Sequence, residues 1–248
     1  MKSLLVSVVA AVVLVGCGES QQSAPAPEPP TAKAPAISIV DAAYKGKIEA
    51  VKQHLAAGTG VNAKDDLTGL TPLHQAARGV VRPGAGRLGD PLRPKLRYEG
   101  HKEIAELLIE KGADVNARDD IGYTPLDHTI GHDENEIADL LRKHGGKHGT
   151  IHTAAKAGDA EAVKEFLAAG ADVNVKGGSE WTPLHEATRG GRKGIVKLLI
   201  AKGADVNAKD WRGRTPLDFA IIKRQSEIAD LLRKHGGKTA EELKAEGK

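Results

Sequence analysis

Histidines four residues apart are the first groups in this sequence whose spacing could do chemistry, because imidazoles one helical turn apart can share a metal ion. Three glycines between positions 144 and 150 interrupt any helix that would align the longer set, so we interpret those histidines as linkers and expect no metal site. Paired carboxylates at Asp65-Asp66 and Asp119-Asp120 fall in turns, where we expect them to be solvated rather than catalytic. The histidines are His144, His148 and His152 in one set and His128 and His132 in the other.

Two glycine patterns could cradle a phosphate, but neither has the required surroundings. The first, G-x-G-x-x-G at residues 84–89, has Pro83 before it and Asp90-Pro91 after it, where a dinucleotide site needs a strand and then a helix. The second ends in Gly-Lys-Thr at residues 237–239, but Leu232 stands where a P-loop needs its first glycine. We therefore expect no nucleotide cofactor, and the nucleophile pattern G-x-S-x-G does not occur.

Composition narrows the class of protein. Of 248 residues, 40% are apolar and only 3% are aromatic, which suits thin layers of small side chains better than one large enzyme core. A charged fraction of 28% excludes a protein with several membrane spans, and a formal net charge of +3 is too small to indicate nucleic-acid binding. The single cysteine excludes an intrachain disulfide and a cysteine zinc site.

That cysteine lies in a segment with the character of a targeting signal. Lys2 precedes an apolar run at residues 4–15, which is shorter than the roughly 18 residues of a membrane-spanning helix. The end of the run, Leu14-Val15-Gly16-Cys17, resembles the lipobox of bacterial lipoproteins. The resemblance implies that residues 1–16 are a cleaved lipoprotein signal peptide and that Cys17 is lipidated. A plain secretory signal with a chance cysteine is the alternative.

The lipoprotein resemblance also implies a location. Acyl chains would anchor the protein to the bacterial cell envelope, facing the periplasm or the extracellular side. Gly18 follows the cysteine, whereas an Asp there would resemble the inner-membrane retention signal, so the outer membrane is favoured. Residues 17–36 are rich in proline and cannot bury a core, which predicts an extended tether.

From residue 37 onward the sequence repeats. Thr-Pro-Leu followed by His or Asp begins at positions 71, 124, 182 and 215, and Gly-Ala-Asp-Val-Asn begins at positions 112, 170 and 203. These motifs resemble the ankyrin repeat. The resemblance implies an all-α fold: an ankyrin-repeat solenoid of helix–turn–helix units with β-hairpin-like finger turns, in about six repeats over residues 37–238.

Each motif has a physical reason at its place in the repeat. The Thr71 hydroxyl can accept a hydrogen bond from the first turn of a helix, and Pro72 suits the first helical position. Leu73 and the alanine pair after it are expected to pack on the neighbouring repeat. A second helix is predicted over residues 103–111, with Gly112 ending it in the left-handed conformation.

The six units span about residues 37–65, 66–118, 119–148, 149–176, 177–209 and 210–238. Units four to six resemble a copy of units one to three. Residues 136–147 are identical to residues 227–238, a shift of 91 positions. Earlier in the copy the shift is 111, because unit two carries an insertion at residues 79–98. The sequence therefore predicts two similar three-repeat halves, with a subtle break near Gly145-Gly146.

The insertion at residues 79–98 and the tail at residues 239–248 lie outside the repeat pattern. Five Arg or Lys side chains and one Asp give the insertion a net charge of +4, and its prolines and glycines argue against regular structure. It could act as an electrostatic arm for an acidic partner or lipid headgroups, and a tolerated, solvated insertion is the alternative. We expect the polar tail to be helical or frayed.

The ankyrin resemblance implies which residues bind a partner, because the family binds proteins through its finger turns and inner helices. His74 and His185 are then structural, whereas Asp127 and Asp218 lose the imidazole bridge between repeats. Trp and Arg dominate binding energy at interfaces, and covering a repeat junction is the alternative for Trp181. The implied binding positions are Leu67, Thr68, Leu70, Arg78, Asp120, Ile121, Tyr123, His132, Ser179, Trp181, Arg189, Trp211, Arg212, Arg214, Ile222 and Lys223.

Together these features predict a non-catalytic protein–protein interaction module anchored to the bacterial cell envelope by an N-terminal lipid. The sequence does not identify the protein partner. A periplasmic protective or immunity-type inhibitor of an enzyme or toxin is the alternative, and an enzyme that uses the insertion as an active-site loop is a further one. No cofactor, nucleic acid or small-molecule substrate is expected.

Overall fold

The computed structural model describes residues 34–79, 100–130 and 136–247, all within one compact unit that begins at Ala32. The predicted signal peptide, Cys17, most of the tether, the insertion apart from Gly79, and His132 lie outside the described residues. Within the described ranges the regular structure is entirely helical, and no helix is long and apolar enough to cross a membrane.

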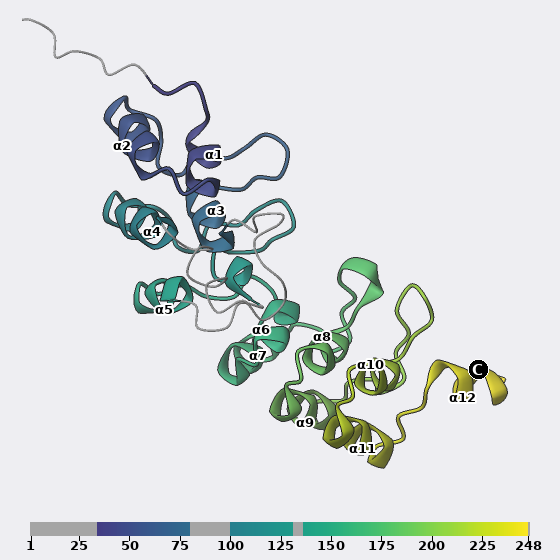
Figure 1. The fold of residues 1–248 in the computed structure, drawn as a ribbon. Helices are drawn as coiled ribbons and strands as arrows, with labels where there is room; N and C mark the ends of the chain where they lie inside the picture. The colour runs from purple at the N-terminus through teal and green to yellow at the C-terminus, as the bar shows by residue number, and fades with distance from the viewer. Residues whose placement is uncertain (1–33, 80–99, 131–135, 248) are drawn as a thin grey trace, which may run out of the picture. The chain divides into compact units, whose positions relative to one another are not determined.

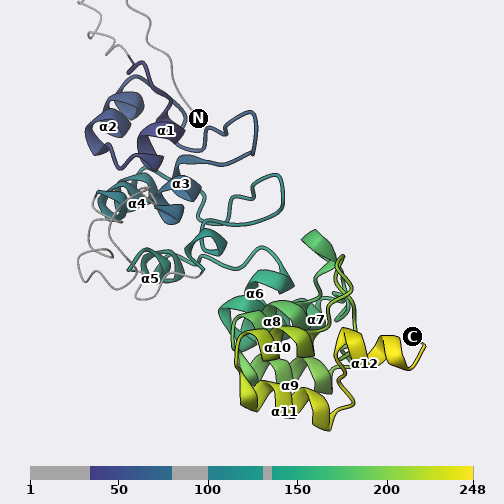
Figure 2. The same ribbon diagram turned by 45° about the vertical axis from the view of Figure 1, so that its right-hand side comes forward.

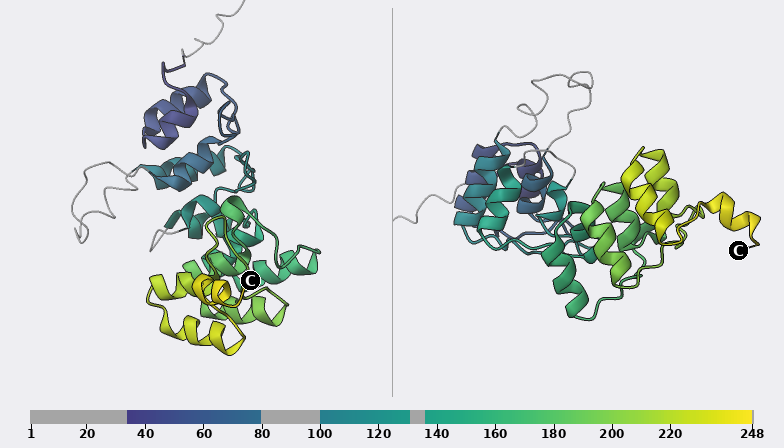
Figure 3. Two further views of the ribbon diagram at one scale, coloured as in Figure 1. Left: turned by 90° about the vertical axis from the view of Figure 1, so that its right-hand side faces the viewer. Right: turned by 90° about the horizontal axis from the view of Figure 1, so that it is seen from below.

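The described helices alternate between an inner row and an outer row, with finger turns projecting beyond the inner row (Figure 1). The same pairing is seen in the rotated views of Figures 2 and 3. The inner elements are α1 (Ile39–Tyr44), α3 (Pro72–Arg78), η2 (Asp127–Thr129), α6 (Ile151–Ala157), α8 (Pro183–Arg189) and α10 (Pro216–Ile222). The outer helices are α2 (Ile48–Ala56), α4 (His101–Glu110), α5 (Glu136–Lys143), α7 (Ala160–Ala168), α9 (Lys193–Ala201) and α11 (Ser226–Lys234). The short η3 (Gly178–Glu180) lies in a finger, and α12 (Ala240–Ala245) makes the tail helical.

The inner helices begin as the Thr-Pro-Leu motif predicts. Thr71, Thr182 and Thr215 are the N-caps of α3, α8 and α10, and in each the side-chain oxygen accepts the backbone N–H three residues on. Proline occupies the first helical turn of all three helices, where its missing N–H costs no hydrogen bond. The outer helix α4 begins two residues before the predicted start, and Gly112 after it has a φ of 84°, as its role in ending the helix requires.

The hydrophobic core is divided into two clusters, one in each half. Alanine pairs such as Ala76-Ala77 are fully buried and let the inner helices pack closely. Leu108 and Leu199, 91 positions apart, are both fully buried, each in the core of its own half. The boundary between the clusters falls between Leu141 and Ile151, in the stretch where the sequence predicts a break.

Hydrogen bonds accepted by one buried carboxylate, that of Asp127, connect the two halves. Asp127 accepts the N–H of Gly149 at 2.8 Å and that of Thr124 at 3.0 Å, and its other oxygen lies 2.7 Å from Nδ1 of His148. Asp127 therefore lacks the imidazole bridge, as expected, but its carboxylate makes a different bridge between repeats. His74 donates from Nε2 to a carbonyl of the next finger, 3.1 Å away, whereas the aspartate accepts from N–H groups of the following segment.

Asp218 repeats this arrangement at the end of the array. Its carboxylate accepts the N–H of Ala240, the first residue of α12, at 3.0 Å and that of Thr215 at 2.8 Å. Asp218 too makes a carboxylate bridge in place of the imidazole bridge. An aspartate thus replaces the histidine where the chain continues into a short segment and not into a full finger.

Unit three has a single 3₁₀ turn, η2, where the motif at Thr124 predicts an inner helix. The Thr129 hydroxyl donates to the Leu126 carbonyl at 2.7 Å, and the Thr129 N–H also reaches that oxygen, at 3.1 Å. The same kind of bond, from the Thr153 hydroxyl to the Thr150 carbonyl at 2.8 Å, occurs in the full helix α6. The Thr129 bond therefore accompanies the shortened element and does not by itself account for it.

Candidate binding surface

An aspartate organises each of three finger turns. The Asp210 carboxylate accepts the backbone N–H groups of Arg212 and Arg214, both at 2.9 Å. Asp65 and Asp119 hold their own fingers in the same way. The expectation that the carboxylate pairs are solvated is therefore wrong for Asp119, which is 8% exposed. Asp65 is half-buried, and each of the two serves its finger as an internal acceptor.

The same hydrogen bonds lower the pKa of Asp210 and of Asp65. Burial alone would raise the pKa of Asp210, but the N–H groups of Arg214 and Arg212 and the Arg214 guanidinium hold it below the ordinary 3.8. For Asp65, burial again raises the pKa and the Thr68 hydroxyl and finger N–H groups outweigh it. The Arg214 guanidinium forms an ion pair with Asp210 at 2.8 Å and lies over the Phe219 ring at 4.4 Å from its centroid. Because of these two contacts, Arg214 is not a free cation for a partner.

The finger tips hold apolar side chains in solvent. Leu67 is 91% exposed, Ile121 68% and Trp211 57%. Backbone hydrogen bonds of 3.1 and 3.2 Å join the fingers of units two and three and those of units five and six, so the tips lie side by side. Other predicted binding residues exposed on these fingers are Thr68, Asp120, Ser179 and Arg212.

The two tryptophans have different roles. Trp211 is exposed with the Arg212 guanidinium 4.4 Å above its ring, which leaves it available to a partner. Trp181 is half-buried, and its ring packs on Phe219 of the next repeat with a centroid distance of 4.6 Å. The contacts of Trp181 thus support the alternative that it covers a repeat junction.

Leu70 is a second predicted residue whose place differs. It is 5% exposed, because it directly precedes the buried Thr71 cap and its N–H is held by Asp65. The prediction that Leu70 lies on the surface is wrong. Tyr123, one residue before its own Thr cap, is half-buried, and burial raises its pKa above 10.0.

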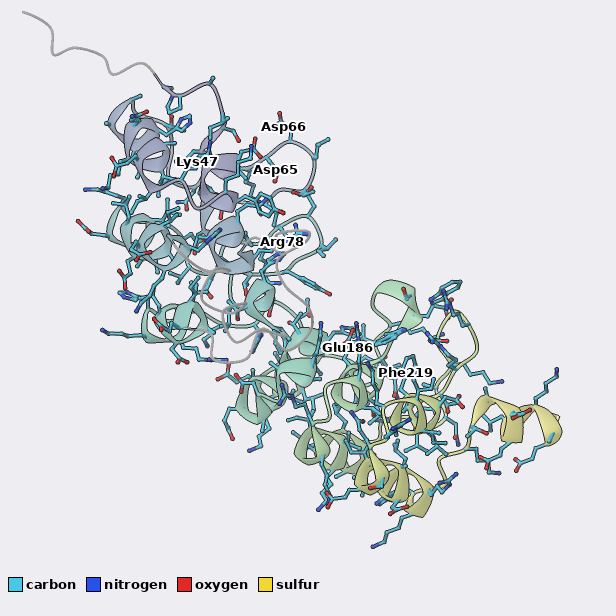
Figure 4. All side chains as sticks on the ribbon, viewed as in Figure 1. Lys47, Asp65, Asp66, Arg78, Glu186 and Phe219 are labelled. Atoms are coloured by element: carbon cyan, nitrogen blue, oxygen red, sulfur yellow. The ribbon has the colours of Figure 1, made fainter. Side chains whose placement is uncertain are left out.

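The predicted positions that follow the alanine pairs of the inner helices are exposed where the structure describes them. Arg78 and Arg189 end α3 and α8, and Ile222 and Lys223 stand at the end of α10. Arg78 lies on the side of the finger that carries Asp65 and Asp66 (Figure 4).

One groove in the first half gathers most of the predicted residues of that half. It has a volume of about 610 Å³ and lies between the fingers of units two and three and the end of α3. Tyr44 and His128 also line it, and His128 lies 2.9 Å from Asp119. Sequence reasoning missed Tyr44, although it follows the pair Ala42-Ala43 just as Arg78 follows its own pair. The predicted residues that line the groove are Leu67, Thr68, Leu70, Arg78, Asp120, Ile121 and Tyr123.

Helix pairs of this kind, threonine-capped and joined by aspartate-held fingers, define a helical repeat array. The chain matches ankyrin repeats (3 copies) over residues 151–242 and ankyrin repeats (many copies) over residues 94–141. The protein is therefore built of ankyrin repeats, as its motifs predict. Ankyrin repeats indicate a protein–protein interaction module.

Curated relatives match over parts of their length. Ankyrin repeat-containing protein P1E11.10 of Schizosaccharomyces pombe is 35% identical over 85 residues, 34% of this chain and 31% of that protein. Serine/threonine-protein kinase 12 of Arabidopsis thaliana is 37% identical over 112 residues, 45% of this chain and 20% of the kinase. 26S proteasome non-ATPase regulatory subunit 10 of Mus musculus is 29% identical over 89 residues, 36% of this chain and 30% of that protein. The chain thus spans less than a third of each.

Proposed function

We propose that the protein is a non-catalytic binding protein whose finger tips and inner-helix ends hold a protein partner. One observation carries the proposal. Leu67, Ile121 and Trp211 are exposed at finger tips, and Ile221 and Ile222 are exposed at the end of α10. These five are the large apolar side chains that the described residues leave exposed. Apolar side chains held in solvent on rigid turns are typical of interaction sites.

The histidines and aspartates that could act in catalysis have structural roles instead, and this favours binding over catalysis. His74 and His185 cap their helices and bridge to the next finger, and Asp119 and Asp210 organise fingers. Burial lowers the pKa of His74 and of His185 below 6.5, against opposing effects of their carbonyl partners. Both imidazoles are therefore neutral at neutral pH and bonded to the backbone.

We also propose that Cys17 is lipidated and anchors the array to the bacterial cell envelope, with the outer membrane favoured. The lipobox-like residues and the proline-rich segment after them support this anchor. Cys17→Ser should leave an unprocessed precursor without lipid label. If the variant is still acylated and stays on membranes after an alkaline wash, the anchor proposal is wrong.

Partner capture tests the binding proposal. The intact chain and the variant Leu67→Ser/Ile121→Ser/Trp211→Ser are each used to capture proteins from solubilised envelope, with Lys102→Ala on the outer row as the control. We expect a protein that the intact chain and the control retain and the tip variant loses. Its identity would separate a general scaffold from an inhibitor of an enzyme or toxin. Equal capture by all three would contradict binding through the tips.

A further inference from the structure

The second half carries cations where its inner helices end. Lys156, Arg189 and Lys223 lie in the last turn of α6, in the last turn of α8 and at the C-cap of α10, with Arg224 after Lys223. We call these four side chains the turn row. Arg189, Lys223 and Arg224 are exposed and Lys156 is half-buried. One cation in each repeat therefore faces the same side of the second half.

The turn row carries charge that ion pairs do not use. On the outer helices Lys164 pairs with Glu161 at 2.7 Å and Lys193 with Glu227 at 2.8 Å, whereas Lys197 forms no ion pair with a described carboxylate. No side chain of the turn row forms an ion pair with a described carboxylate. Cations near a helix C-terminus do complement the helix dipole, but that effect needs no row of unpaired charges.

Interlocking side chains hold the turns of successive repeats together. The Arg192 guanidinium donates from Nε to the Lys156 carbonyl at 3.0 Å. Gln225 lies beside the turn of unit five, with its side-chain nitrogen 3.3 Å from the place where a Cβ on Gly191 would stand. The Arg192 bond therefore joins the turn that carries Lys156 to the next repeat.

Acidic groups on this side are few and mostly engaged. Glu186 lies on α8 (Figure 4), where it interacts electrostatically with Lys156 and Arg189. Burial raises its pKa above 4.5, against the lowering effects of Lys156, Arg189 and His152, so it is more easily neutralised than an ordinary glutamate. Asp159 caps α7 through the Ala162 N–H, and Glu180 pairs with Lys176 at 2.7 Å.

We propose that the turn row of the second half, together with Trp211 and Ile222, binds an extended acidic segment of a protein partner. The inference rests on the proposed binding function and deepens it. Adjacent helix pairs lie about 10 Å apart, and a segment in the extended polyproline II conformation advances about 3.1 Å per residue with every third side chain on the same face. A carboxylate at every third position can therefore meet one cation per repeat. The exposed Trp211 and Ile222 fit an apolar residue of the same segment.

A labelled synthetic peptide of about 12 residues, enough to cross three repeats, is the probe. It carries Glu at every third position and one Phe, and control peptides carry Gln for Glu or gather all Glu at one end. Fluorescence anisotropy with the whole chain should show binding of the spaced acidic peptide that weakens as salt rises. The control peptides should bind at least about tenfold more weakly.

Two charge-matched variants test the site. Lys156→Gln/Arg189→Gln/Lys223→Gln should weaken peptide binding about tenfold or more, whereas Lys197→Gln/Lys202→Gln/Lys234→Gln on or beside the outer helices should change it less than about twofold. Equal losses of peptide binding in the two variants would overturn the proposal. Anionic vesicles and duplex DNA are tested in the same way, and a turn-row variant that loses binding to these alone, and not to the peptide, would also overturn it. If the peptide fails to bind while the tips still capture an envelope protein, this inference alone is wrong. If both fail, the proposed function is wrong as well.

Discussion

The two halves of the array share a framework and differ on the surface. Asn116 donates to the carbonyl of residue 145 at 3.0 Å and accepts the N–H of Lys147 at 2.7 Å. Asn207 does the same 91 positions later, at 3.0 and 2.8 Å. The hydroxyls of Thr124 and Thr215 both donate 2.7 Å to the carbonyl of the following Gly-Gly-Lys lysine. The same contacts thus fold both halves.

The surfaces that this framework presents are unlike. The first half exposes Leu67 and Ile121 beside the acidic Asp66 and Asp120, whereas the second exposes Trp211 beside Arg212 and carries the turn row. Since the framework contacts are the same in both halves, these differences are not needed for folding. We therefore infer that a partner is recognised at the finger tips and the turns, and that the two halves suit differently charged parts of that partner.

Removing a matched leucine from each core should have the largest effect. Leu108→Ala and Leu199→Ala each empty a fully buried site and should cost roughly 2–5 kcal/mol of folding free energy. Because the cores are separate, Leu199→Ala should raise hydrogen exchange in units five and six first, and Leu108→Ala in units one to three. A uniform loss of protection along all units in either variant would contradict two separable halves.

Matched aspartates at the ends of the halves should differ in importance. Asp127→Asn places an amide where two N–H groups and a histidine ring converge, and should cost about 1–3 kcal/mol. Asp218→Asn should cost less, because Asp218 is only half-buried and bridges to the tail. Urea unfolding of the two variants makes the comparison, and an equal or larger loss for Asp218→Asn would be the contrary result.

Acid should weaken the connection at Asp127. Burial raises the pKa of this carboxyl, but hydrogen bonds from His148, Thr124 and Gly149 hold it below 3.8. Its stabilising contribution is therefore complete above the unfolded value and is lost as pH falls through the lowered folded value. Urea midpoints of the native chain should drop between about pH 5 and pH 2 more steeply than those of Asp127→Asn. If the urea midpoints of the two proteins fall in parallel, the ionisation of Asp127 does not contribute to the stability of the junction.

Exposed ion pairs should matter least. Lys102 pairs with Glu136 at 2.6 Å and Lys193 with Glu227 at 2.8 Å, at equivalent places on the outer rows of the two halves. Both pairs are solvent-exposed, so Lys102→Ala and Lys193→Ala should leave the melting temperature within experimental error. A clear drop in one half only would mean that its outer helices depend on this pair.

Much of the fold follows from local sequence. The threonine caps and Gly112 could be predicted because their hydrogen bonds and backbone angles involve only a few neighbouring residues. The role of Asp127 could not, since it depends on N–H groups that arrive from a segment more than 20 residues away. The shortened η2 could not be predicted either, because the same Thr-Pro-Leu-Asp motif begins the full helix α10.

Part of the binding surface could be predicted from the sequence. Exposure of Leu67, Ile121 and Trp211 follows from their place at finger tips. Burial of Leu70 and the packing of Trp181 on Phe219 depend on how each finger folds back, which no pattern in one repeat specifies. Tyr44 and Lys156 follow alanine pairs in degenerate units, so the rule that found Arg78 would have found them too.

The most direct test compares the two tryptophans in binding to the captured partner. Trp211→Ala should weaken binding by about 2 kcal/mol or more and leave the melting temperature nearly unchanged, because its ring is exposed at a tip. Trp181→Ala should instead lower the melting temperature, because it removes the packing on Phe219 across a repeat junction. If Trp211→Ala unfolds the array while its folded fraction still binds normally, then Trp211 is a core residue and the finger tips do not bind the partner.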